Sequence, residues 1–165
     1  GPDSPGVIDV VRRDPRLLAV RGNNEQKIIC GDENPGWLRD GDRAYFESLP
    51  IVISFDNTLV VHGGLDPEKR LEDHTVDELL TMRSPNGDGY DGPFWYDEYD
   101  GPYRVFFGHT VHESPIEREY AVGLDTGCVY GQMLTAYDYR EGTYITVDQT
   151  TTHQNRDDSK VVKPV

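Results

Sequence analysis

Four side chains that can bind metal ions each come directly after an apolar run, at the point where a predicted strand ends. They are Asn23, His62, His109 and Asp125. In open α/β sheets the loops at strand ends share one rim, so we expect these side chains to lie close together. Histidine is a common ligand of transition metals, and mixed histidine, asparagine and aspartate ligation suits Mn, Fe, Zn or Co. The spacing therefore predicts a metal site at this rim.

Each of these residues also has an ordinary structural interpretation. Asn23 follows a glycine and can be a turn residue, and Asp125–Gly127 can be a plain β-turn. His62 precedes Gly63-Gly64, which indicates a close backbone approach or a positive φ angle. His112 is either a further ligand or a solvated loop residue. The shared position at strand ends favours the metal site over four separate turns.

Arg83 ends a predicted helix, 75–83, and precedes a long irregular stretch, Asn86–Asp100. Because arginine matches phosphate oxygens bidentately, Arg83 is a candidate phosphate-binding residue. The alternative is an arginine that only complements the helix dipole. The aromatic residues of Asn86–Asp100 could stack on a base or form a lid, although plain packing is the favoured interpretation.

Apolar periodicity and capping residues predict an α/β (α+β) fold within a single domain. Helices are predicted at 7–13, 25–30, 43–49 and 75–83, the last with Thr75 as N-cap and Glu78 closing a capping box. Strands are predicted at 17–20, 51–55, 58–61, 103–107, 117–124, 133–139 and 144–147. The polar residues from 150 onward are predicted to fray, so the domain is placed at 1–148 and a tail at 149–165.

The formal net charge of −14 argues against long nucleic acid as a partner, because phosphate backbones require clustered Lys and Arg. Four lysines stand against twelve arginines. An acidic, lysine-poor surface suits a cytoplasm of high salt, where screening removes self-repulsion, and we take such an organism as a hypothesis for the origin of the chain. No stretch has the length or apolarity of a membrane span, so a cytoplasmic location without a membrane partner is expected.

Four sequence motifs together resemble the later motifs of the calcineurin-like metallophosphoesterases. They are Gly22–Glu25, His62–Gly64, Gly108–Thr110 and Asp125–Ala136. The branch that they resemble holds the symmetrical diadenosine tetraphosphatases and PrpE-type phosphatases. Gly1–Pro5 is similar to the end of that family's Gly-Asp-x-x-Asp-Arg-Gly-Pro-Asp-Ser motif, so the resemblance extends from about Gly1 to Thr146.

The resemblance implies two packed mixed β-sheets flanked by helices, with two divalent metal ions at the strand ends. It implies that a hydroxide bridging the metals attacks a phosphomonoester, a dinucleoside polyphosphate or a phosphoprotein. Asn23, His62 and His109 would be metal ligands, and Asp125 would orient a ligand without binding the metal itself.

Two departures from the family pattern qualify this expectation. The motifs that supply the remaining ligands would lie before Gly1, so we expect the chain to be the C-terminal portion of a domain whose first strand–helix unit comes from a missing segment or a complementary chain. In addition, the family's Gly-Asn-His-Glu reads Gly-Asn-Asn-Glu here, which puts Asn24 at the general-acid position. An amide cannot deliver a proton near neutral pH, and loss of a general acid costs about 10²–10⁴-fold in rate. The alternative function is therefore a catalytically impaired subunit with a binding or structural role in a larger assembly.

Overall fold

The computed structural model describes residues 3–86, 89–90 and 92–163. Gly1 and Pro2 of the N-terminal motif lie outside the described residues, as do positions 87, 88 and 91 of the stretch Asn86–Asp100 and positions 164–165 of the predicted tail.

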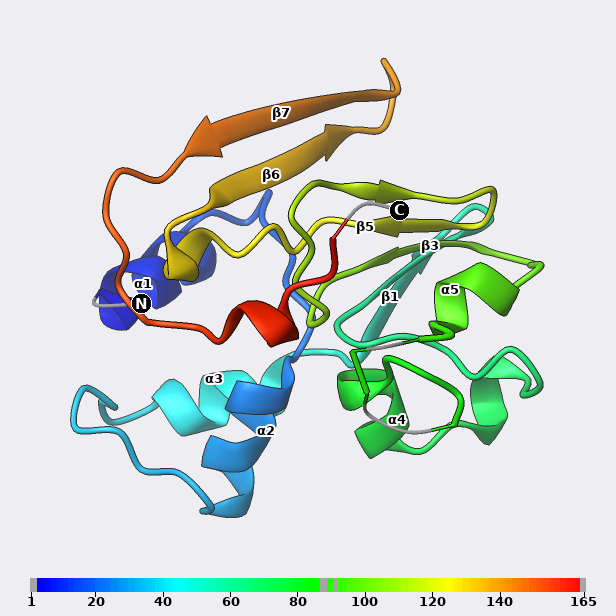
Figure 1. Ribbon diagram of the computed structural model, residues 1–165. Coiled ribbons are helices and arrows are strands. Elements are labelled where there is room, and N and C mark those ends of the chain that lie inside the picture. Colours follow the sequence, from blue (N-terminus) through cyan, green and yellow to red (C-terminus); the bar gives the residue numbers. More distant parts are fainter. Residues whose placement is uncertain (1–2, 87–88, 91, 164–165) are drawn as a thin grey trace.

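A five-stranded mixed sheet forms the centre of the molecule (Figure 1). Its strands follow the order β1 (Val52–Phe55), β2 (Thr58–Val61), β3 (Arg104–Phe107), β5 (Ala121–Gly123) and β4 (Ile116–Glu117). The three inner strands β2, β3 and β5 are parallel, while β1 and β4 pair antiparallel at the edges. Inner parallel strands are covered on both faces, which explains their near-continuous apolar sequences.

A second sheet, made of β6 (Met133–Asp138) and β7 (Thr143–Asp148), packs on the first. Aromatic side chains join the two layers, because the rings of Tyr137 and Tyr139 lie 5.3 and 6.2 Å from the ring of Phe106. The Tyr139 hydroxyl also lies 3.2 Å from the Thr58 hydroxyl. The predicted fold class, two packed sheets flanked by helices, is confirmed.

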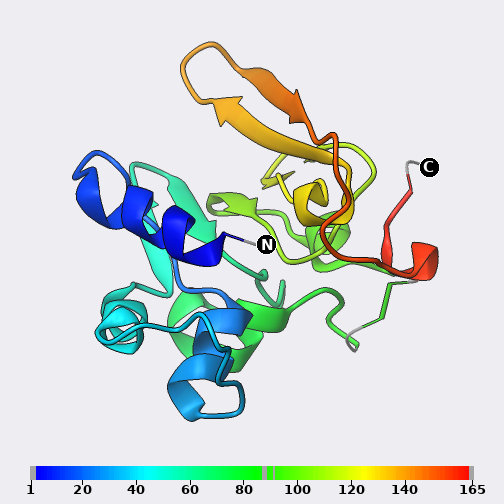
Figure 2. The same cartoon turned by 90° about the vertical axis from the view of Figure 1, so that its left-hand side faces the viewer.

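Helices pack around the sheets (Figure 2). They complete two separate hydrophobic clusters. The helices α1 (Ser4–Arg13), α2 (Asn23–Cys30) and α3 (Asp42–Ser48) pack around Ile8, Ile28 and Phe46. The helices α4 (Val76–Thr81) and α5 (Trp95–Glu98) contribute to the larger cluster against the five-stranded sheet. The predicted capping box of α4 is confirmed, with Thr75 Oγ1 accepting from the Glu78 amide at 3.2 Å.

The predicted strand at Leu17–Val20 is wrong. These residues are extended coil, and the Leu17 and Leu18 side chains are 44% and 77% exposed. A strand requires a neighbour for its backbone hydrogen bonds, and no strand pairs with this segment in the part of the chain that is described. The apolar run therefore predicted a strand for which the described residues provide no partner strand.

Two further expectations require correction. The single strand predicted at 117–124 is two strands, β4 and β5, because Arg118–Tyr120 form a turn between them. The stretch 86–100 is not wholly irregular, since it contains α5, in which Trp95 is fully buried and packs against Phe107 with ring centroids 4.9 Å apart. Packing, rather than a lid, describes the aromatic residues around Trp95.

The predicted frayed tail is instead bound to the rest of the molecule. The amides of His153 and Gln154 donate to the Val129 carbonyl, and the Val162 amide donates to the Val111 carbonyl at 2.9 Å. A short 3₁₀ helix, η3 (Asp158–Lys160), lies between these attachments. Polar composition predicted fraying, but the attachments are made by backbone groups, which composition does not report.

The interpretation of His112 as a solvated loop residue is wrong, because its side chain is almost fully buried and its Nε2 atom lies 3.0 Å from the Tyr96 hydroxyl. Burial, assisted by the charge of Arg118, lowers the pKa of His112 to about 4. Its pKa in the unfolded chain is about 6.5, so between these values the unfolded chain binds a proton that the folded chain excludes.

We therefore expect His112 to make the fold less stable as the pH falls from 6.5 toward 4, by up to about 1.4 kcal/mol per pH unit. His112→Gln stays neutral and keeps an acceptor for Tyr96, so it should remove this part of the pH dependence. Urea unfolding of both proteins at pH 7 and 5 measures the difference. Equal pH dependence in the two proteins would contradict the prediction.

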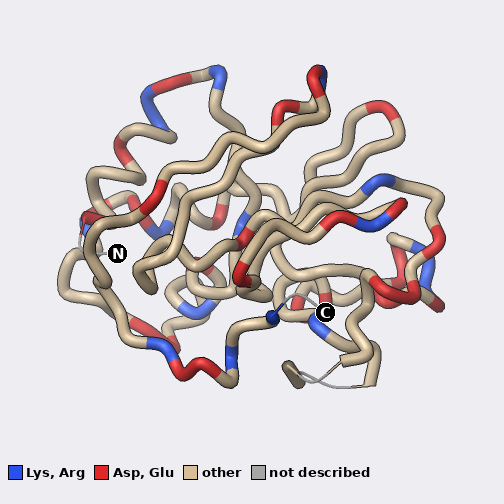
Figure 3. Tube along the Cα trace, turned by 45° about the horizontal axis from the view of Figure 1, so that its top comes forward, with Lys and Arg blue, Asp and Glu red and all other residues tan. Residues whose placement is uncertain are grey.

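Within the described residues, no helix is long and apolar enough to cross a membrane. Acidic residues are spread along the chain, and Lys and Arg do not merge into one continuous stripe (Figure 3).

Candidate active site

Three parallel strands deliver side chains to one rim of the five-stranded sheet. His62 directly follows β2, His109 comes two residues after β3, and Asp125 comes two residues after β5. The pairing continues past the strands, because the Gly108 amide donates to the His62 carbonyl at 3.0 Å. This parallel pairing confirms the expectation that these strand ends share one rim.

The glycines beside His62 allow close backbone packing. A Cβ atom at Gly63 would lie 2.7 Å from backbone atoms of α4, and one at Gly64 would lie 2.1 Å from Trp95 Nε1. The predicted close approach is thus the reason for both glycines. It fixes the backbone from which His62 extends.

Asn23 and Asn24 are the first two residues of α2. The Gly22 amide ahead of them donates to Glu25 Oε2 at 2.9 Å, which closes the helix start. A Cβ atom at Gly22 would lie 3.2 Å from the His62 imidazole, so the glycine lets this turn approach the sheet rim. The helix start thereby brings both asparagines to the histidines.

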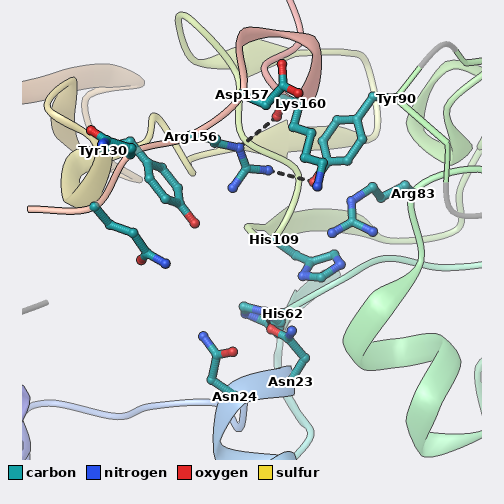
Figure 4. Close-up of a pocket in the computed structure, with 12 residues that line it drawn as sticks. Asn23, Asn24, His62, Arg83, Tyr90, His109, Tyr130, Arg156, Asp157 and Lys160 are labelled. Carbon is teal, nitrogen blue, oxygen red and sulfur yellow. Dashed lines mark hydrogen bonds between the residues drawn. The ribbon is translucent and has the colours of Figure 1, made fainter.

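These elements surround a cavity of about 380 Å³ (Figure 4). Five of the six predicted site residues line it, namely Asn23, Asn24, His62, Arg83 and His109. The sequence had named one further lining residue, Tyr90, among the aromatic residues that could stack on a base. It did not predict the others, which are Tyr130, Gln154, Asn155, Arg156, Asp157 and Lys160. Most of these come from the segment that we expected to fray.

The predicted ligand atoms face one another in this cavity. The Nε2 atom of His62 lies 2.8 Å from Asn23 Oδ1, and the rings of His62 and His109 are 5.1 Å apart. The first distance is that of a hydrogen bond, so the His62 imidazole and the Asn23 amide oxygen are in direct contact. The Nε2 atom of His109 is buried without a hydrogen-bond partner among the described residues, so it is available to bind a metal ion.

His109 adopts a left-handed backbone conformation with φ of 61°. For a residue other than glycine this conformation is unfavourable by about 1–3 kcal/mol, and such strain occurs most often at functional sites. The turn Gly108–Thr110 therefore directs the imidazole into the cavity at some expense in stability.

Both histidines are held in the neutral form that metal ions bind. Burial and the charge of Arg83 lower the pKa of His62 to about 4. Burial, Arg83 and the neighbouring His62 lower the pKa of His109 to about 3. At neutral pH both rings therefore offer a lone pair without first losing a proton.

The residues present fit part of a metal centre. They offer two imidazoles and one amide oxygen, but no group of three or more His, Cys, Asp or Glu side chains with ligand geometry occurs among the described residues. A pair of divalent ions needs carboxylate ligands in addition.

Asp125 does not line the cavity. Its carboxylate accepts from the Gly127 amide at 3.1 Å, while its backbone carbonyl accepts from the His112 amide. Burial raises the pKa of the Asp125 carboxyl group. In the described structure Asp125 holds the turn after β5, and no hydrogen bond joins it to Asn23, His62 or His109.

Arg83 lines the cavity, and its guanidinium lies 4.7 Å from the centre of the Tyr90 ring. The Nε atom of Arg83 is buried and has no hydrogen-bond partner among the described residues. An arginine that only complements a helix dipole need not point into a cavity or leave a buried N–H donor unpaired. Both features favour the phosphate-binding interpretation of Arg83.

Comparison with known proteins confirms the resemblance to metallophosphoesterases of the diadenosine tetraphosphatase and PrpE branch. The chain is 34% identical over 108 residues to the bis(5'-nucleosyl)-tetraphosphatase PrpE [asymmetrical] of Bacillus subtilis, which is 58% of this chain and 43% of that protein. It is 27% identical over 111 residues to the PrpE of Halalkalibacterium halodurans, which is 62% of this chain and 45% of that protein. The relatives carry the name asymmetrical, and PrpE-type phosphatases are one of the two groups in the branch that the motifs resemble.

A solved structure shares the fold. It is a crystal structure provisionally assigned as a diadenosine tetraphosphatase, with a TM-score of 0.76 and 28% sequence identity, over 90% of this chain and 75% of that chain. The chain spans 43–45% of the length of these two curated relatives. No family model matches the sequence.

Proposed function

We propose that this chain carries part of the active site of a metal-dependent phosphoesterase, which hydrolyses a phosphomonoester or a dinucleoside polyphosphate. The observation that carries the proposal is the cavity in which two neutral histidines face Asn23. Arg83, which forms no salt bridge with the described carboxylates, lines the same cavity. Metal ligands next to an anion-binding arginine are the parts that phosphoryl transfer requires. The names of the curated relatives agree with this reaction class.

Each side chain has a separate role in the proposal. Asn23, His62 and His109 would hold divalent ions such as Mn, Fe, Zn or Co, with the remaining ligands coming from outside the described residues. When bound, the two ions polarise the phosphoryl oxygens and lower the pKa of the attacking water. Arg83 would bind the phosphate oxygens, and Asn24 would donate a hydrogen bond to the leaving oxygen.

The test is Mn²⁺-stimulated hydrolysis of p-nitrophenyl phosphate and of diadenosine tetraphosphate by the full-length protein. We expect turnover that is lost in EDTA and restored by Mn²⁺. Turnover that EDTA does not affect would contradict the proposal.

The second candidate function is a non-catalytic subunit of a larger assembly. Asn24 favours it, as does an exposed apolar face on the β6–β7 sheet that Leu134, Ile145 and Val147 form at 59–63% exposure. A missing N-terminal segment or a complementary chain is the partner that such a face would bind. No bound metal, no hydrolysis and a stable complex in native mass spectrometry would together favour this function.

We also propose that the chain works in a cytoplasm of high salt, because 30 acidic residues face 16 basic ones. Screening of self-repulsion should raise the free energy of unfolding as KCl increases from about 0.01 M, where the Debye length is about 30 Å, to about 1 M, where it is about 3 Å. Urea unfolding across this series measures the effect. Stability that does not rise with salt would refute the proposal.

A further inference from the structure

The C-terminal strap, residues 153–160, lies across one side of the cavity. Backbone hydrogen bonds attach its start to Val129, and those of Val162, just beyond its end, attach it to Val111 and Glu113. Figure 4 shows Arg156 and Lys160 extending from the strap on the side of the cavity opposite Asn23 and Asn24. The strap therefore adds two cationic side chains to a site whose predicted ligands come from other elements.

The guanidinium of Arg156 is fixed in position. Its Nε donates to the Lys160 carbonyl at 2.9 Å, and its Nη2 donates to the Tyr90 hydroxyl at 2.6 Å. The same group lies 4.6 Å from the centre of the Tyr130 ring and 5.5 Å from that of Tyr90. Arginine has five N–H donors, so most of them are left for a ligand.

Three cationic side chains, those of Arg83, Arg156 and Lys160, line the cavity against one carboxylate, that of Asp157. Elsewhere in this acidic chain arginines such as Arg104 and Arg118 pair with acidic side chains. In contrast, no salt bridge among the described residues includes Arg83, Arg156 or Lys160. The Asp157 carboxylate caps η3 by accepting from the Ser159 amide, and its negative charge interacts with Lys160, so it offsets part of the positive charge and leaves the two arginines unpaired among the described residues.

Tyr90 lies between the two arginines, with Arg83 4.7 Å and Arg156 5.5 Å from its ring centre. Two like charges on one ring repel each other, and an anion that contacts both would offset the repulsion. The buried, unpartnered Nε of Arg83 is a second sign of an absent anionic partner.

We infer that the strap forms a second phosphate subsite, in which Arg156 and Lys160 bind the phosphate next to the reacting one. The inference rests on the proposed function, because Arg83 and the metal ligands define the first phosphate position. It predicts that the site favours substrates with at least two linked phosphates over an isolated monophosphate. Arg156 acts here as a positioning and specificity residue rather than a catalytic one.

Calorimetric binding of inorganic tripolyphosphate and orthophosphate to the EDTA-treated protein tests the subsite without metal chemistry. We expect Arg156→Gln to weaken tripolyphosphate binding about ten-fold, as for the loss of a charge-assisted hydrogen bond near solvent. Orthophosphate binding should change less than about two-fold, because the first position keeps Arg83. Arg140→Gln, which removes the same charge from the β6–β7 turn, is the matched control and should leave both affinities unchanged.

Lys160→Gln provides a second variant that keeps the carbonyl contact to Arg156, and we expect about three-fold weaker tripolyphosphate binding. Unchanged tripolyphosphate binding in Arg156→Gln, or an equal loss of both ligands, would overturn the second subsite. If the binding differences appear but hydrolysis does not, the proposed function fails while the subsite stands. If hydrolysis proceeds and the variants bind as the wild type does, only the subsite fails.

Discussion

We expect His62→Ala and His109→Gly each to lower Mn²⁺-stimulated hydrolysis by at least about 100-fold and to reduce the bound metal in the same preparation. Changes to outer partners of a metal ligand typically cost 10–100-fold, so loss of a direct ligand should cost at least the upper value. Glycine is chosen at position 109 because it accepts the left-handed φ of 61° without adding a ligand atom. The expected loss is therefore chemical rather than conformational.

Metal content by mass spectrometry and the kinetic constants measure both effects. His74→Ala is the matched control, because the imidazole of His74 binds the Asp66 amide and the Arg70 carbonyl and does not line the cavity. It should keep wild-type metal content and rate. Full metal occupancy and activity in either of the first two variants would remove that histidine from the ligand set.

We expect Asn24→His to raise the rate for substrates with a poor leaving group by about 10²–10⁴-fold, the contribution of a general acid. Asn24 is exposed at the start of α2 and lines the cavity, so an imidazole there can reach a bound leaving oxygen. The gain should be small for p-nitrophenyl phosphate, whose leaving group needs little protonation. A histidine can deliver a proton only in its protonated form. The rate of the variant should therefore fall as the pH rises above about 6.5.

A comparison of phenyl phosphate with p-nitrophenyl phosphate between pH 5 and 9 measures this prediction. Asn155→His is the control, because it adds a histidine to the same cavity from the C-terminal strap. An Asn24→His protein with the wild-type leaving-group dependence and pH profile would show that position 24 is not where the proton is delivered.

The sequence predicted much of the site because its parts follow from local rules. Short apolar runs that end in glycine and histidine place His62 and His109 at the ends of parallel strands, and parallel pairing brings those ends together. Asn23 follows from the glycine turn ahead of α2. The proximity of these residues could therefore be predicted from local patterns in a single sequence.

The errors arose where the outcome depends on neighbours distant in sequence. The apolar run at Leu17–Val20 predicted a strand, but strand formation needs a partner strand. His112 is buried rather than solvated because it contacts Tyr96, and that contact joins two segments that are separate in the sequence. The C-terminal strap is held by backbone bonds and by stacking of Arg156 on tyrosine rings, and neither leaves a periodic signal.

The parallel register of β2 and β3 also links metal binding to the accuracy of folding. Val60 pairs with Phe106, and this ladder sets the level of His62 relative to His109. A slip of one residue would displace one ligand by about 3.3 Å and turn alternate side chains to the opposite face of the sheet. Metal ions that bind only the correctly paired strands would stabilise that pairing by mass action. Metal binding would then favour the native strand register during folding, in addition to its role in the proposed reaction.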